Sequence, residues 1–144
     1  MTEIGATSAP GLNRPGLLTA MKVASSLFAA LVLLQAIIAG RGWFKDFDLI
    51  KTHGQIGSFV LLVAIVQAVL AFMVFGSRSR LALVGAVLVV LTAIQLSLGY
   101  SSRDSSTAAS LHIPNGVLIF GIATAFASSV LRVGGAADER AGSR

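Results

Sequence analysis

Four long apolar stretches, separated by short polar segments, dominate the pattern of this chain. They run over about 23–39, 56–75, 81–98 and 113–131. Each is close to the roughly 20 residues that an α-helix needs to cross a hydrocarbon core of ~30 Å. Backbone groups in lipid must be paired within the segment, so we expect helices at about 17–39, 54–75, 81–100 and 112–131. The pattern predicts an all-α, integral membrane, up-down four-helix bundle.

The composition favours a membrane protein over a soluble one. Hydrophobic residues make up 55% of the chain and charged residues 12%, and the mean hydropathy is +0.84. Soluble domains of this size are rarely so apolar. The first stretch could instead be a secretory signal peptide. However, about 22 residues precede it and Leu33–Gly40 is a weak cleavage context, so we expect it to remain as a helix.

Two classes of function are disfavoured. The chain contains no cysteine, which excludes disulfides, thiolate ligands and c-type heme attachment. The formal net charge is +5, but the basic residues are spread over loops and tails without a cluster or interleaved aromatic residues. Nucleic-acid binding is therefore not expected.

The basic residues divide unevenly between the two sides of the predicted bundle. One side holds Arg14, Lys22, Arg78, Arg80, Arg132, Arg140 and Arg144. The other holds Arg41, Lys45, Lys51 and Arg103. The positive-inside rule then places both termini in the cytoplasm of a cell (inner) membrane, with outer loops at about 41–52 and 100–111. We expect a bundle domain over 16–133 between flexible cytoplasmic tails at 1–15 and 134–144.

The only two histidines share one local pattern, H-x-x-x-G, and each follows a glutamine at nearly the same distance. The matching positions are Gln35, His53 and Gly57 in the first half and Gln95, His112 and Gly116 in the second. This predicts two helix-loop-His-helix repeats, at about 17–75 and 81–132.

Topology gives the paired histidines a chemical meaning. Alternate helices of an up-down bundle run parallel across its diagonal, so His53 and His112, each expected at the first turn of its helix, should lie at one depth. Two imidazoles facing each other at one level suit the axial ligation of heme b. Gly57 and Gly116 lie one turn below and would let a flat macrocycle approach the backbone. Small residues also promote helix packing in bilayers, which accounts for the glycines equally well.

Other polar residues could assist such a site. Gln35 and Gln95 could each accept the second N–H of an imidazole, although hydrogen bonding between helices explains them as simply. Arg41, Lys51 and Arg103 could pair with heme propionates, or could be interfacial anchors beside Trp43 and Tyr100.

Gln67 lies deeper in the second stretch. A mid-membrane amide needs a partner, and we expect Thr92, Thr124 or Ser128 to provide one.

Zinc or copper is an alternative to heme, with Asp46, Asp48 or Asp104 completing the ligands. Such sites usually take three or four protein ligands, so two strong ones suit heme better. The remaining alternative is that both histidines lie at the membrane interface and bind no metal or cofactor.

At these residues the chain resembles one four-helix half of the heme A synthase family. The resemblance covers about 20–132 and rests on the spacing of His53 and His112 and on Gln95–Gly99 followed by Ala109–His112. Family enzymes have two such bundles, with a glutamate before the first histidine and often a cysteine pair. Here Asp48 precedes His53 and cysteine is absent. The resemblance implies heme binding, while oxidation of a heme substrate would require a homodimer.

These observations predict a membrane-embedded b-type heme protein, with one heme near the outer face. We expect it to act in electron transfer or heme handling beside a respiratory chain. The expected partners are the lipid bilayer and either a second copy or a respiratory complex. The alternatives are a cofactor-free accessory subunit, a quinone-interacting oxidoreductase subunit, and a heme-A-synthase-like oxidase acting as a dimer.

Overall fold

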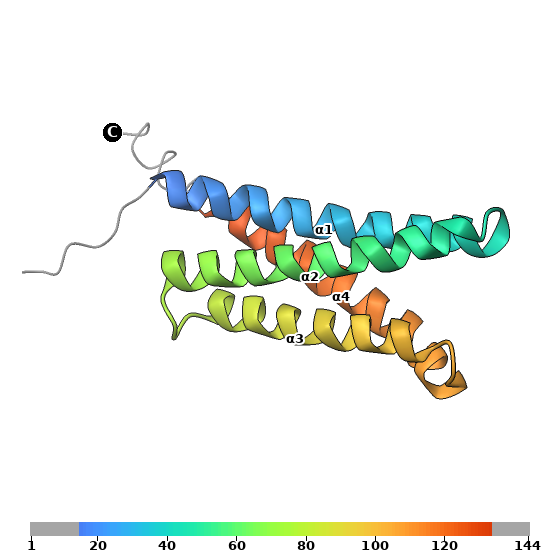
Figure 1. Cartoon of the computed structure of the whole chain (residues 1–144). Coiled ribbons are helices and arrows are strands. Elements are labelled where there is room, and N and C mark those ends of the chain that lie inside the picture. Colours follow the sequence, from blue (N-terminus) through green and yellow to red (C-terminus); the bar gives the residue numbers. More distant parts are fainter. Residues whose placement is uncertain (1–14, 134–144) are drawn as a thin grey trace, which may run out of the picture.

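The computed structural model describes residues 15–133, which form four helices joined by short turns (Figure 1). The helices are α1 (Pro15–Phe44), α2 (Asp48–Phe75), α3 (Arg80–Ser101) and α4 (Ser106–Arg132). Each is long and apolar enough to cross a membrane, and this part of the chain contains no strand. The predicted all-helical fold, with four helices of membrane-spanning length and composition, is therefore confirmed. The flexible tails predicted at 1–15 and 134–144 lie outside the described residues, apart from Pro15, which begins α1.

The helices run alternately up and down and close into a ring (Figure 1). The helix pairs whose backbones approach each other are α1 with α2, α2 with α3, α3 with α4, and α4 with α1; among the described residues the backbones of the diagonal pairs stay apart. The start of α1, the α2–α3 turn and the end of α4 lie together at what we call the terminal end. The α1–α2 and α3–α4 turns form the opposite end, which we call the histidine end.

The turn between α1 and α2 is much shorter than the predicted loop at 41–52. Helix α1 continues to Phe44, and α2 begins at Asp48. A Cβ atom at the buried Gly42 would lie 2.8 Å from Cδ1 of Ile50 and 3.1 Å from its backbone nitrogen. This close packing of the two helix ends holds residues helical that local composition assigned to a loop, because tertiary contacts override weak propensities.

The loop predicted at 100–111 is also wrong, because α4 begins at Ser106. The side chain of Ser105 accepts a hydrogen bond from the backbone N–H of Ala108 at 3.2 Å, which is an N-cap. Pro114 lies inside the helix and leaves one carbonyl without its helical donor. Both histidines therefore lie in the second turn of their helices, not in the first turn as predicted.

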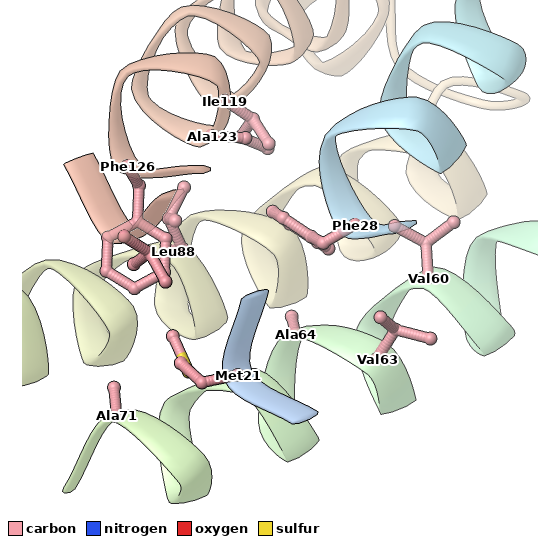
Figure 2. Packing of buried hydrophobic residues seen from close by; sticks show 11 residues of the cluster. Met21, Phe28, Val60, Val63, Ala64, Ala71, Leu88, Ile119, Ala123 and Phe126 are labelled. Atoms are coloured by element: carbon pink, nitrogen blue, oxygen red, sulfur yellow. The ribbon is translucent and has the colours of Figure 1, made fainter. Parts of the chain in front are cut away.

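The core is built from buried side chains of all four helices (Figure 2). It contains Met21 and Phe28 of α1, Val60, Val63, Ala64 and Ala71 of α2, Leu88 of α3, and Ile119, Ala123, Phe126 and Val130 of α4. The many alanines let the helices approach closely, as is typical of helix packing in membranes. Large apolar side chains such as Leu83 and Val117 are exposed on the outer faces of the bundle. An apolar exterior around a tightly packed core fits a lipid environment.

Gln67 of α2 is the exception within this core. Its side chain is fully buried, and neither amide atom has a hydrogen-bond partner among the described residues. Thr92 and Thr124 donate instead to the carbonyls of Leu88 and Phe120 in their own helices. The prediction that a neighbouring hydroxyl group pairs with Gln67 is wrong.

Replacing Gln67 with leucine is expected to stabilise the bundle. Leaving a buried polar group unpaired costs about 1–3 kcal/mol, which an apolar side chain of similar size avoids. The unfolding midpoint in detergent, followed by circular dichroism, should rise for Gln67→Leu. Gln55→Leu is the control, because Gln55 is exposed on the same helix and its midpoint should change little. A fall in the midpoint of Gln67→Leu would contradict an unpaired amide.

Candidate functional site

His53 and His112 meet inside the ring of helices at the histidine end. They come from α2 and α4, the diagonal pair whose backbones do not touch in the described part of the chain. Their ring centroids are 6.0 Å apart, and the ring planes are inclined at 74°. Both side chains are half-buried. The fold thus brings together the chain's only two imidazoles from opposite sides of the bundle.

His53 is held by the backbone of α1. Its Nδ1 atom lies 3.1 Å from the carbonyl oxygen of Gln35. A carbonyl only accepts, so Nδ1 carries the proton and donates it. The side chain of Gln35 returns the contact, because its Nε2 donates to the carbonyl of His53 at 3.0 Å. This leaves Nε2 of His53 as the nitrogen with a lone pair, the usual arrangement of a metal-binding histidine.

His112 is held by side chains instead. Nε2 of Gln95 lies 3.2 Å from Nε2 of His112. An amide nitrogen only donates, so Nε2 of His112 accepts and its proton is on Nδ1. Nδ1 is buried and has no hydrogen-bond partner within the described residues. Asn115 completes the network, since its Nδ2 donates to Oε1 of Gln95 at 2.8 Å and to the carbonyl of Leu91 at 3.2 Å.

The two glutamines therefore contact the two histidines, but not in the predicted role. Neither side chain accepts an imidazole N–H: the backbone of Gln35 does so for His53, and Gln95 donates to His112. Sequence reasoning also missed Asn115. The signal for it was an amide in an otherwise apolar membrane segment, where a polar side chain requires a partner.

The glycines of the two patterns make room for the glutamines. A Cβ atom at Gly57 would lie 3.3 Å from Nε2 of Gln35, and one at Gly116 would lie 3.1 Å from Nε2 of Gln95. The space beside each glycine is thus filled by an amide, and the glycines do not form the open seat expected for a macrocycle. Gly99 of α3, which sequence reasoning did not place at the site, faces His112: a Cβ atom there would lie 3.0 Å from Cε1 of the imidazole.

The charged residues proposed as propionate partners lie at the same end of the molecule. Arg41 is in the last turn of α1 and Arg103 is in the α3–α4 turn, and both are exposed. The guanidinium carbon of Arg103 lies 5.9 Å from the ring centroid of Tyr100, a cation–π distance. The role of these residues toward an anion stays a prediction.

The 6.0 Å between the imidazole centres matches the spacing of two ligands of one metal ion, but Nε2 of His112 faces Gln95 in the structure. A metal–nitrogen bond of about 2 Å on each side, with the radius of each ring added, separates the ring centres by roughly 6 Å. Within residues 15–133, no three histidine, aspartate or glutamate side chains lie close enough together to hold a metal ion. The zinc or copper site completed by Asp46, Asp48 or Asp104 therefore does not form. A macrocycle that supplies its own equatorial nitrogens suits a site with two protein ligands.

Comparison of the chain with protein-family models, curated proteins and solved structures gave no match. The function is therefore inferred from the residues themselves.

Proposed function

We propose that this chain is a membrane-embedded b-type heme protein in which His53 and His112 are the axial ligands. The observation that carries the proposal is the placement of two imidazoles from opposite helices with their centroids 6.0 Å apart. Heme, when bound, supplies one-electron chemistry at its iron. The chain's own residues orient the two imidazoles and surround the site with apolar helices that limit the access of water.

The surroundings of the histidine end support an anionic cofactor. Arg41 and Arg103 lie at this end and are suited to pair with propionates. The amino-terminal ends of α2 and α4 also lie there and add positive potential. Arg78, Arg80 and Arg132 belong to the terminal end, so the positive-inside rule places that end in the cytoplasm and the site near the outer face of a cell membrane.

The proposed role is electron transfer or heme handling beside a respiratory chain. A glutamine–histidine contact in each half, Gln35 with His53 and Gln95 with His112, supports two copies of one helix-loop-His-helix unit. The resemblance to one half of the heme A synthase family rests on the spacing of His53 and His112 and on the segments Gln95–Gly99 and Ala109–His112. We favour electron transfer over oxidation of a heme substrate, because Asp48 takes the place of the family's glutamate and is exposed in the first turn of α2.

The test is the heme content of the purified chain. Protein produced in cells supplied with heme should give one heme b per chain in a pyridine hemochrome measurement. Reduction should give a low-spin spectrum with sharp α and β bands. The double variant His53→Ala/His112→Ala, with unchanged helicity by circular dichroism, should carry none. Folded wild-type protein without heme would refute the proposal and indicate a cofactor-free accessory subunit.

A further inference from the structure

The two histidines differ in which ring nitrogen can bind a metal. On His53, Nδ1–H is donated to the carbonyl of Gln35, and Nε2 makes no hydrogen bond in the described part of the chain. On His112, Nε2 accepts from Gln95 at 3.2 Å, and the protonated Nδ1 is buried. His53 thus offers a free lone pair, whereas neither nitrogen of His112 does so.

Gln95 cannot release His112 by turning its amide over. The turned amide would point its Nε2 at Nδ2 of Asn115, so that two donors would face each other across 2.8 Å. Asn115 cannot turn in compensation, because its Oδ1 would then face the carbonyl of Leu91, to which Nδ2 now donates. The direction of the whole network is therefore set by a backbone oxygen of α3. His112 gains a free Nε2 only by losing its bond to Gln95.

We propose that His53 is the permanent axial ligand and that His112 is an exchangeable one, which Gln95 and Asn115 hold away from the iron. This rests on the function proposed above and adds the regulation of the same site. A small neutral ligand of ferrous heme, of the class of carbon monoxide, competes for the position of His112. In the exchange, one iron–nitrogen bond breaks, one bond from the incoming ligand to iron forms, and Nε2 of His112 regains the N–H of Gln95. No proton or electron is transferred.

The test compares two matched glutamine variants of the heme-loaded protein. Gln95→Leu removes the bond that competes with iron for His112, so its affinity for carbon monoxide should fall about fivefold, the size expected for one neutral hydrogen bond. Gln55→Leu changes an exposed glutamine of α2 that is outside this network, so its affinity should match the wild type. Carbon monoxide titrations of the reduced proteins in detergent, followed at the Soret band, measure both.

A second measurement needs no heme. Nitrogen-15 NMR of the imidazoles in heme-free protein should show the Nδ1–H form of both histidines, with a hydrogen-bonded Nε2 on His112. Gln95→Leu should shift the Nε2 resonance of His112 and leave that of His53 unchanged.

The outcomes separate this inference from the function on which it rests. If the folded wild-type protein contains no heme, both the proposed function and the ligand exchange are refuted. Heme-loaded protein that binds no carbon monoxide overturns ligand exchange and leaves heme binding intact. Equal affinities of Gln95→Leu and Gln55→Leu for carbon monoxide overturn the exchange in the same way, as does a proton on Nε2 of His112 in the heme-free protein.

Discussion

His53→Ala is expected to abolish heme binding, whereas His112→Ala should keep heme in a high-spin form. His53 presents an unengaged Nε2 and is anchored through Nδ1 to the backbone of α1, so its loss removes the prepared ligand. Removing a residue that hydrogen-bonds to a metal ligand typically weakens metal binding about 10–100-fold. Removing the ligand His53 itself should therefore weaken heme binding by about 100-fold or more. In His112→Ala the remaining His53 still binds the iron. Heme-to-protein ratios and electron paramagnetic resonance spectra measure both effects.

Added imidazole provides the control for these variants. It should restore the low-spin spectrum of His112→Ala, because the site left by the side chain lies opposite a bound His53. Equal loss of heme from the two variants would contradict the inequality of the ligands. Full retention of low-spin heme by either variant would contradict the axial role of the histidine that was replaced.

The four spanning helices could be predicted from the sequence because each apolar stretch has the length of the bilayer. The turns at the histidine end could not be predicted in this way. Five of the residues in 41–52 are charged, which is typical of a loop, yet Gly42 packs against Ile50 and both remain helical. Local composition does not contain that contact, because it depends on how two helix ends meet in space.

The level placement of the histidines followed from topology, but the difference between them did not. Gln35 precedes His53 by 18 residues, and Gln95 precedes His112 by 17. The connecting turns also differ, with residues 45–47 between α1 and α2 and residues 102–105 between α3 and α4. The backbone carbonyl of Gln35 contacts Nδ1 of His53, and the side chain of Gln95 contacts Nε2 of His112. Two nearly identical patterns in the sequence give two chemically unequal ligands.

Close contact between α2 and α3 makes Gly85 a sensitive packing position in the bundle. A Cβ atom at Gly85 would lie 3.3 Å from Cα of Ala68 and 3.5 Å from Cβ of Ala71. The nearest of these atoms is backbone, which cannot move without moving α2. The Gly85→Leu variant is therefore expected to push the two helices apart.

Gly85→Leu should lower the free energy of unfolding by at least the roughly 1–3 kcal/mol that is typical of overpacked cores. A whole side chain enters a space in which a single added carbon would already be tight. The midpoint of thermal unfolding in detergent, followed by circular dichroism, should fall well below that of the wild type. Gly121→Leu is the matched control, since Gly121 of α4 is exposed and a Cβ atom there would meet nothing within 4 Å. Its midpoint should stay level or rise slightly, because leucine is a better helix former than glycine. Equal midpoints for the two variants would show that α2 and α3 do not pack backbone to backbone at this position.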